Sequence, residues 1–277
     1  MNKVAFVTGA SRGIGRETAV AFARAGFDVA ISARTVEEGE HSDHRLCDAQ
    51  GVPLPGSLNG TAAEIRAVGR EALVVPMDLL DSASVLAAAQ TVLAAFKRID
   101  VLVNNAIYQG SDLNGAYMTL QPQTLERVFK GYVLAPLLLT QAVLAGMLER
   151  GAGVVINVTS GAGEGDPPVA AADGGWGYAY GAGKAAVSRV SGVLAAELGA
   201  QGIRAFTVNP GVVTTDALKA TLGERGVLAL RIGTAPPEVP AAVMVWLATA
   251  AQALDHQRRT IAAQPFALEH GIVADWR

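Results

Sequence analysis

Residues 8–15 read TGASRGIG, and this stretch decides the fold of the chain. It follows a short apolar run, Val4 to Thr8, which reads as a buried strand, and it leads into the helical spacing of Ile14 to Ala25. Small residues let a backbone approach a pyrophosphate, and the helix behind them supplies unpaired N–H groups and the positive end of a dipole. A strand, a glycine turn and a helix in this order favour a dinucleotide-binding unit over an ordinary tight turn.

Strands and helices alternate along the rest of the chain. The predicted strands are apolar throughout, which is typical of a parallel sheet covered by helices on both faces. We therefore predict a single α/β, doubly wound domain over residues 1–277, with a break in its long helix at Pro136, which cannot continue a regular helix. The further strands are expected at 28–33, 72–76, 100–104, 154–159, 203–208 and 259–263, and the helices at 61–69, 82–97, 121–149, 178–198 and 237–250. Loop-rich insertions are expected at about 37–60 and 161–176.

Composition excludes several classes of protein. The 277 residues are 51% hydrophobic and carry 22 basic and 25 acidic side chains, so no excess of positive charge indicates a nucleic-acid partner. The most apolar run, Tyr132 to Leu148, is short for a bilayer and is interrupted by proline, glycine and polar residues, so we expect a core or interface helix and no membrane span. The single cysteine excludes an intramolecular disulfide, and the N-terminus does not resemble a signal peptide, so the expected location is cytoplasmic.

The end of the second predicted strand bears on the choice of nucleotide. In dinucleotide folds, an acidic residue roughly 20 positions after the glycine loop binds the adenosine ribose 2′-OH. Here residues 32–35 read SART, without a carboxylate, and Arg34 stands in that neighbourhood while Arg12 lies in the glycine loop. Guanidinium groups suit a 2′-phosphate, which favours NADP(H), with NAD(H) as the other candidate. The alternative is that Arg34 caps a surface turn.

Residues 178–184 read YAYGAGK and place a tyrosine and a lysine one helical turn apart. Tyr180 and Lys184 share a helix face, and the lysine charge would lower the pKa of a phenol that ordinarily titrates near 10. Tyr180 would then exchange a proton with a substrate oxygen. Gly181 and Gly183 weaken a helix by roughly 1 kcal/mol each, which fits a face pressed close to the sheet or a cofactor. The alternative is a pair of core tyrosines and a solvated lysine.

The order of the motifs resembles that of the short-chain dehydrogenase/reductase family over about Lys3 to Ala250. The motifs are TGASRGIG, Asn104-Asn105-Ala106, Ser160, Tyr180-x-x-x-Lys184 and Asn209-Pro210-Gly211. The resemblance implies about seven strands and hydride transfer between NADP(H) and a small carbonyl or secondary-alcohol substrate. It implies that Ser160, Tyr180 and Lys184 are catalytic: Ser160 holds the substrate oxygen, Tyr180 is the general acid/base, and Lys184 also reaches the nicotinamide ribose.

The resemblance also implies a set of cofactor contacts. Asp78 would touch adenine, although a helix N-cap is an equally good interpretation of an aspartate there. Thr215 and the backbone of Val213 would contact the nicotinamide carboxamide. Residues 212–234 would form a lid, whose small apolar side chains indicate an apolar or mixed substrate. The complete implied set is Gly9, Ser11, Arg12, Gly13, Ile14, Gly15, Arg34, Asp78, Leu79, Asn105, Ala106, Tyr180, Lys184, Pro210, Gly211, Val213 and Thr215.

Three features depart from the family pattern. Ile107 stands where relatives carry glycine, which suggests a displaced loop beside the nicotinamide. Tyr132 aligns with a position that is commonly an active-site asparagine, and it is either a core side chain or another route for the proton. Ser160 and Tyr180 lie unusually far apart in the chain. These departures leave open a reductase of activated C=C bonds or a non-catalytic NADP(H)-binding sensor, and Tyr178 is either a packing residue or a wall of the substrate site.

Two further expectations concern metals and subunits. The first insertion contains His41, His44 and Cys47, whose spacing matches no strong zinc pattern, so we predict no metal site and interpret the segment as a surface excursion beside the adenosine end of the cofactor. The long helices at 121–149 and 178–198 are expected to join two or four subunits into a homo-oligomer.

Overall fold

The computed structural model describes residues 2–40, 47, 48, 50–222, 233–274 and 276. Its centre is a seven-stranded sheet with strand order β3-β2-β1-β4-β5-β6-β7, in which every neighbouring pair is parallel. The strands are β1 (Val4–Thr8), β2 (Asp28–Ala33), β3 (Ala72–Pro76), β4 (Val101–Asn104), β5 (Gly153–Val158), β6 (Ile203–Asn209) and β7 (Thr260–Ala262). The prediction of a doubly wound parallel sheet is confirmed.

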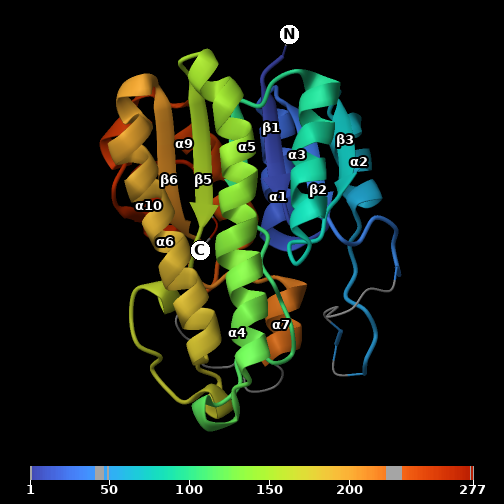
Figure 1. Cartoon of the computed structure of the whole chain (residues 1–277), viewed down its shortest axis with the longest axis vertical. Helices are drawn as coiled ribbons and strands as arrows, with labels where there is room; N and C mark the ends of the chain where they lie inside the picture. The colour runs from blue at the N-terminus through green and yellow to red at the C-terminus, as the bar shows by residue number, and fades with distance from the viewer. Residues whose placement is uncertain (1, 41–46, 49, 223–232, 275, 277) are drawn as a thin grey trace.

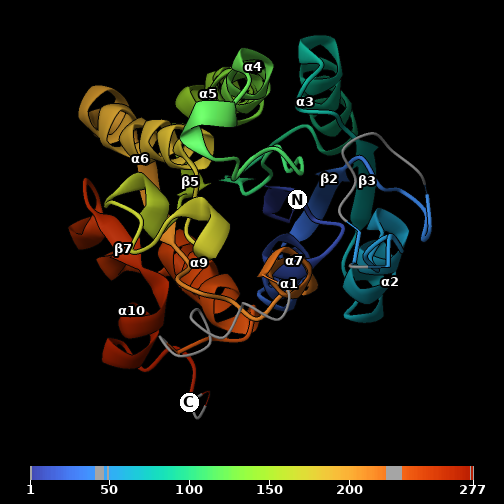
Figure 2. The same cartoon turned by 90° about the horizontal axis from the view of Figure 1, so that it is seen from below.

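Helices cover the sheet in two layers (Figures 1 and 2). One layer contains α1 (Gly13–Arg24), α2 (Leu58–Ala67), α9 (Glu238–Thr249) and α10 (Ala263–Glu269), and the other contains α3 (Ser82–Phe96), α5 (Ala135–Glu149) and α6 (Tyr178–Leu198). Successive strand residues point to opposite layers, so Ile31 packs with α1 and α9 while its neighbour Ala30 packs with α3 and α5. Because both faces of the sheet are covered, the strands are apolar throughout.

The long helix predicted at 121–149 is interrupted. It consists of α4 (Pro122–Phe129), a π-helical turn η2 (Lys130–Leu134) and α5, and the N–H of Ala135 donates to the carbonyl of Lys130, five residues earlier. Pro136 has no N–H to donate to the carbonyl four residues before it, so a regular α-helix cannot pass through this turn. Pro136 is expected to kink or break the helix; the run in fact continues without a break, and the disturbance takes the form of a widened turn.

Within the described residues, the α4–α5 run is the one helix long and apolar enough to cross a membrane by length and composition. Its most apolar window is 44% buried inside the fold, and Leu139, Val143 and Met147 of α5 are core residues packed with α3. This packing is that of a helix covering a sheet.

Several element boundaries differ from the prediction. Helix α2 begins at Leu58 and not at Thr61, because the Ser57 side chain accepts a hydrogen bond from the Gly60 N–H (3.1 Å) and caps the helix. The last three residues of the 37–60 insertion therefore belong to α2. The helices α7 (Asp216–Leu222) and α10 were not predicted. Residues 223–232 of the proposed lid lie outside the described residues.

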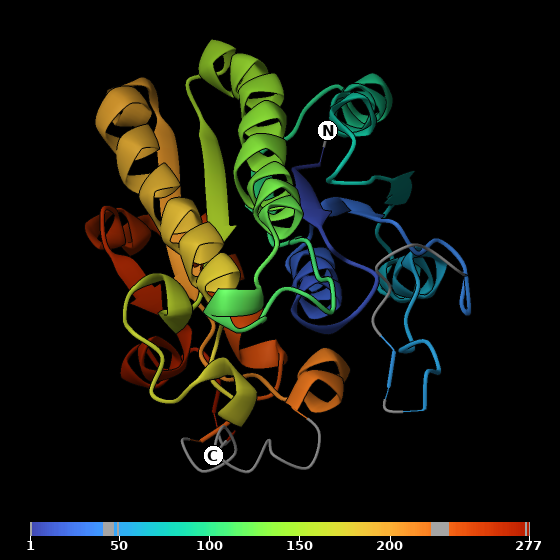
Figure 3. The same ribbon diagram turned by 60° about the horizontal axis from the view of Figure 1, so that its bottom comes forward.

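The carboxyl ends of the strands point toward one edge, where the connecting segments gather below the sheet in Figure 1. Strand order reverses between β1 and β4, and such a switch point is where open α/β sheets bind ligands. Figure 3, with this edge turned forward, shows the segment between β5 and α6 and the short helix α7 on this side of the molecule.

Candidate active site

The glycine loop after β1 forms a cradle that side chains would fill. Gly9 and Gly13 have φ angles of +69° and +55°, which favour glycine, and a Cβ on Gly15 would lie 2.1 Å from the carbonyl oxygen of Gly9. Helix α1 begins at Gly13, its N-cap Arg12 makes no side-chain capping bond, and its first turn has no acidic residue. The loop therefore directs backbone N–H groups and the helix dipole at the space where a phosphate would bind, and the residues present fit a dinucleotide.

The loop after β4 is fixed to the glycine loop. The Asn105 side-chain amide donates to the carbonyls of Thr8 (2.9 Å) and Gly9 (3.3 Å). The Thr8 hydroxyl, which is buried, accepts from the N–H groups of Asn105 and Ala106, both at 3.0 Å. Asn105 and Ala106 thus lie at the switch point beside Gly9, as predicted for them. The role of Thr8 was missed, because a threonine that ends a strand carries no special sequence signal.

The first insertion folds onto the glycine loop. The Arg12 guanidinium donates to the carbonyl of Gly56 (2.9 Å), and a Cβ on Gly56, whose φ is +114°, would lie 2.5 Å from the carbonyl oxygen of Ser11. Arg34 is half-buried just after β2. These contacts join the insertion to the glycine loop, and its place beside the adenosine end of the cofactor stays a prediction.

Asp78 and Leu79 follow β3 and are half-buried. The Asp78 carboxylate accepts from the Leu80 N–H (2.9 Å), whereas the N-cap of α3 is Asp81, which accepts from the Ala83 N–H. The interpretation of Asp78 as a helix N-cap is therefore wrong, and its position at the carboxyl end of β3 fits the adenine contact that the resemblance implies.

The described part of the chain holds no cluster of three potential metal-ligating side chains. His41 and His44 lie outside the described residues, and Cys47 is exposed.

Ser160, Tyr180 and Lys184 come together at the carboxyl end of β5. Ser160 follows that strand, and Tyr180 and Lys184 lie in the first two turns of α6. The Ser160 hydroxyl lies near the Tyr180 phenol and favours its charged form. Lys184 is only 3% exposed, and its Nζ donates to the carbonyl of Val158 (2.8 Å). The three predicted catalytic side chains thus lie on neighbouring segments at this end of β5.

The ionisation of these groups differs from the expectation. Desolvation raises the pKa of Tyr180, and the nearby Ser160 hydroxyl opposes this rise without cancelling it. Burial lowers the pKa of Lys184 to about 7. In the protein without its nucleotide the net direction for the pKa of Tyr180 is therefore upward, and the expected lowering by Lys184 together with a bound nicotinamide cation stays a prediction.

Tyr132 lies beside the predicted catalytic pair. It is 1% exposed in the π-helical turn, its ring meets that of Tyr180 edge-to-face at 6.3 Å, and the Lys184 Nζ is 5.6 Å from the ring centroid. Its hydroxyl donates to the carbonyl of Tyr108 (3.1 Å). A Cβ on Gly183 would lie 2.7 Å from Cδ1 of Tyr132, so Gly183 makes room for this ring. The sequence had instead suggested room for the sheet or a cofactor.

The loop that follows Ile107 is held by a polar cluster that the sequence did not reveal. Arg127 of α4 pairs with Asp112 (2.6 Å), which also accepts from the Tyr108 hydroxyl (2.7 Å) and the Thr124 hydroxyl (2.5 Å). Desolvation raises the pKa of Asp112, but its hydrogen bonds outweigh this effect and hold that pKa at about 2. Among the described residues other than glycine, positive φ occurs at Lys97 and Arg258, so Ile107 has an ordinary backbone conformation.

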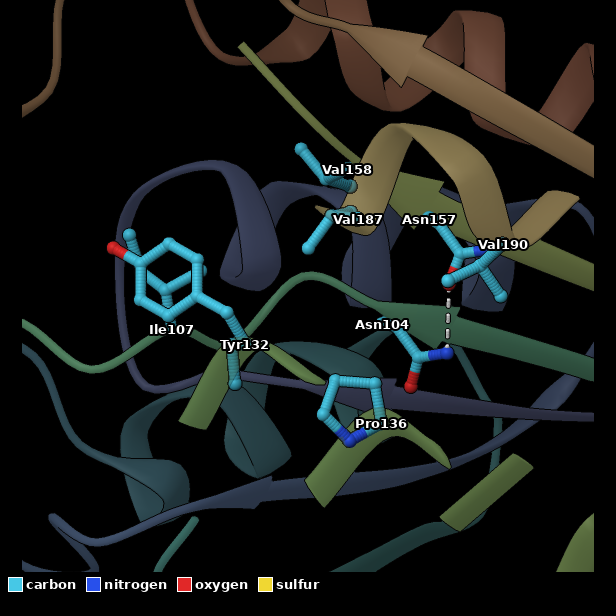
Figure 4. A pocket seen from close by; sticks show the side chains of 9 residues that line it. Asn104, Ile107, Tyr132, Pro136, Asn157, Val158, Val187 and Val190 are labelled. Atoms are coloured by element: carbon cyan, nitrogen blue, oxygen red, sulfur yellow. Dashed lines mark hydrogen bonds between the residues drawn. The ribbon is translucent and has the colours of Figure 1, made fainter. Parts of the chain in front are cut away.

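A small cavity lies behind the site (Figure 4). Its volume of about 10 Å³ is close to what one water molecule needs. On one side the amide of Asn104 donates to the carbonyl oxygen of the Asn157 side chain (3.0 Å). The lining residues are Asn104, Ala106, Ile107, Tyr132, Pro136, Asn157, Val158, Val187 and Val190.

Two loops that border the catalytic side chains contact each other. The Gly177 N–H donates to the side chain of Asn114 (3.1 Å), and the rings of Tyr117 and Tyr178 meet edge-to-face at 5.7 Å. Tyr178 is 55% exposed. The ring of Tyr178 thus packs on that of Tyr117, as one of its two interpretations expects, and its place in a wall of the substrate site stays a prediction.

The turn after β6 is held by α10. The Gln264 amide donates to the carbonyls of Pro210 (3.2 Å) and Val212 (2.8 Å), and Gly211 has a φ of +72°. Thr215 lies next to the glycine loop, since a Cβ on Gly13 would be 3.3 Å from its methyl group. Val213, which lies between Gly211 and Thr215 in the chain, is buried. The segment from Pro210 to Thr215 thus reaches the predicted cofactor site, and Gln264, in a helix that was not predicted, positions it.

Comparisons with known proteins agree with this arrangement. The family described as short chain dehydrogenase matches residues 3–54 and 53–225. D-threitol dehydrogenase from Mycolicibacterium smegmatis is 36% identical over 257 residues, which cover 91% of this chain and 88% of that protein.

Two solved structures share the fold. A metagenomic short-chain oxidoreductase in complex with NADP superposes with a TM-score of 0.67 and 30% identity, over 94% of each chain. A short chain dehydrogenase from Mycobacterium paratuberculosis bound to NAD superposes with a TM-score of 0.77 and 25% identity, over 95% of this chain and 96% of the other. The glycine loop, the Ser-Tyr-Lys cluster and these matches show together that the chain belongs to the short-chain dehydrogenase/reductase family of NAD(P)-dependent oxidoreductases.

Proposed function

We propose that this enzyme interconverts a carbonyl compound and a secondary alcohol with NADP(H), and that Tyr180 is its general acid/base. The observation that carries the proposal is the meeting of Ser160, Tyr180 and Lys184 at the carboxyl end of β5, next to a glycine cradle that fits a dinucleotide. The bound nucleotide would supply or accept the hydride.

The protein side chains have separate roles in this proposal. The hydroxyl groups of Ser160 and Tyr180 lie near each other, so a substrate oxygen placed between them would be held by both. The raised pKa keeps Tyr180 protonated at neutral pH, which is the form that donates a proton during carbonyl reduction. When the nucleotide binds, Lys184 would exchange the Val158 carbonyl for the nicotinamide ribose as its hydrogen-bond partner. The positive charge of Lys184 would then stabilise the phenolate form of Tyr180.

The preference for NADP(H) over NAD(H) is supported by charge at the adenosine end. Arg12 is held there by Gly56, Arg34 follows β2, and the solved relative with 30% identity binds NADP. The relative bound to NAD keeps NAD(H) as the other candidate.

A polyol dehydrogenase among the relatives supports a secondary alcohol as the substrate class. A homo-oligomer is the proposed assembly, because Phe129, Leu137 and Val193 on α4, α5 and α6 are each about half exposed, at 48%, 48% and 51%.

The test begins with fluorescence titrations of the purified protein with NADPH and NADH, followed by a panel of ketones, aldehydes and one activated enone. Tyr180→Phe should lower carbonyl turnover by about 10²-fold or more while NADPH affinity changes by less than about threefold. Tyr117→Phe, which removes the hydroxyl of a tyrosine that is 73% exposed, is the matched control and should keep its turnover. Full turnover in Tyr180→Phe would remove Tyr180 from the mechanism, and turnover of the enone alone would favour C=C reduction.

A further inference from the structure

The ring of Tyr132 contacts both predicted catalytic side chains of α6. The Tyr180 ring meets it edge-to-face at 6.3 Å with an interplanar angle of 89°, and the Lys184 Nζ lies 5.6 Å from its centroid. A cation within about 6 Å of an aromatic face is attracted by the ring quadrupole, and the attraction is strongest where water is excluded. Lys184 and Tyr132 are 3% and 1% exposed, so this pair is dry.

The hydroxyl of Tyr132 is directed elsewhere. It donates to the Tyr108 carbonyl at 3.1 Å, and the Tyr108 side chain is itself held by Asp112 and Arg127. The phenol therefore anchors the ring to the loop after β4, and the ring, not the hydroxyl, faces the ammonium. A proton route through the Tyr132 hydroxyl has no support in this geometry.

Neighbouring backbone features are adapted to the ring. The π-helical turn Lys130–Leu134 carries Tyr132 inward, and Gly183, one residue before Lys184, leaves the space that the ring occupies. On the other side of the ammonium, the Val158 carbonyl accepts a hydrogen bond from Nζ at 2.8 Å. Lys184 is thus held between a carbonyl oxygen and an aromatic face.

We infer that Tyr132 is a positioning residue: its ring stabilises the charge of the Lys184 ammonium in an apolar surrounding and keeps it at the Val158 carbonyl until the nucleotide binds. The inference rests on the proposed roles of Tyr180 and Lys184 and adds a third side chain to them. It assigns to an aromatic ring the place that relatives commonly give to an asparagine.

The test is the direct titration of Lys184 by NMR in the full-length protein made with ¹³Cε-lysine. The signal that is missing from the spectrum of Lys184→Met identifies Lys184. Assignment is simple because the chain has only five lysines, Lys3, Lys97, Lys130, Lys184 and Lys219. Among the described residues, the titratable side chains that face Lys184 are Tyr132 and Tyr180, whose pKa values are both raised. The Asp112–Arg127 pair lies beyond Tyr108. Lys184 should therefore titrate with one midpoint near neutral pH.

Tyr132→Phe keeps the ring and should leave the Lys184 midpoint within about 0.3 pH units, whereas Tyr132→Leu keeps an apolar side chain without a ring and should lower it by about 0.4 to 1.5 units. An unchanged midpoint in Tyr132→Leu would overturn the inference. An equal decrease in Tyr132→Phe would overturn it too, because the hydroxyl would then be the active group.

A second pair of variants covers the case in which Tyr132→Leu does not fold. The methyl group of Gly183→Ala would lie 2.7 Å from both Tyr132 Cδ1 and Val128 Cγ1 and should displace the ring and lower the Lys184 midpoint. Gly192→Ala on the same helix meets nothing within 4 Å and should leave it unchanged. These titrations need neither nucleotide nor substrate, so absent turnover in the unmodified enzyme would refute the proposed function without touching this inference.

Discussion

Replacing Lys184 with methionine should stabilise the nucleotide-free protein while removing its activity. Lys184 is buried, and desolvation lowers its pKa from 10.5 to about 7. The folded protein therefore bears a free-energy cost for every proton that this lysine binds. Methionine has a similar length and no charge, so Lys184→Met removes that cost.

The magnitude follows from proton linkage. In the unfolded chain a lysine is protonated up to about pH 10.5, but folded Lys184 is protonated only up to about pH 7. Between these values the unfolded state binds more protons, so the free energy of unfolding of the wild type rises with pH by about 1.4 kcal/mol per unit. The full cost at pH 6 is about 5 kcal/mol, and about 2 kcal/mol remains at pH 9.

Loss of the Nζ hydrogen bond to the Val158 carbonyl offsets about 1 kcal/mol at either pH. Lys184→Met should therefore be more stable than the wild type by about 4 kcal/mol at pH 6 and by about 1 kcal/mol at pH 9.

The assay is urea unfolding of both proteins at pH 6 and pH 9, followed by circular dichroism. The difference between the two pH values is the sharper quantity, because the packing of the methionine contributes equally to both. Lys130→Met, at an exposed position in the π-helical turn, is the matched control and should change stability by less than about 0.5 kcal/mol at either pH. A stability gain from Lys184→Met that is the same at pH 6 and pH 9 would refute the buried-charge reasoning.

Three further predictions follow from the site and the surface. Arg34→Asp combined with Arg12→Ala should shift the ratio of NADPH to NADH affinity toward NADH by about 10- to 100-fold, because charged hydrogen bonds to a 2′-phosphate would be lost. An unchanged affinity ratio in paired titrations would contradict the NADP(H) assignment. Asp112→Asn should destabilise the protein by about 1 kcal/mol at pH 7. This loss should shrink as the pH falls toward 2, because the wild-type carboxylate then becomes protonated and is uncharged like asparagine. Thermal unfolding across this pH range measures the difference in stability. Light scattering should show a particle at least twice the 28.5 kDa mass of one chain, and a monomer would argue against the exposed faces of α5 and α6 as an interface.

The sequence by itself determined the parallel sheet and the order of its elements. Apolar strands that alternate with helical spacing are typical of a parallel sheet covered by helices, so periodicity indicated the layers, although it missed α7 and α10. The glycine loop and the Tyr180–Lys184 pair could also be predicted, because each depends on contacts within a few residues: a turn too tight for a Cβ, and side chains one helical turn apart.

Tertiary structure alone decided how those local units serve one site. The sequence could not show that Lys184 donates to Val158, 26 residues away, or that burial lowers its pKa to about 7, because desolvation depends on every element packed around a group. It left Tyr132 undecided between core and site, and only the π-helical turn and the gap at Gly183 show that it is both. The burial and electrostatics of a side chain depend on residues far apart in the chain, whereas strands, turns and helical faces depend on residues close in sequence. This difference separates what could be predicted from what could not.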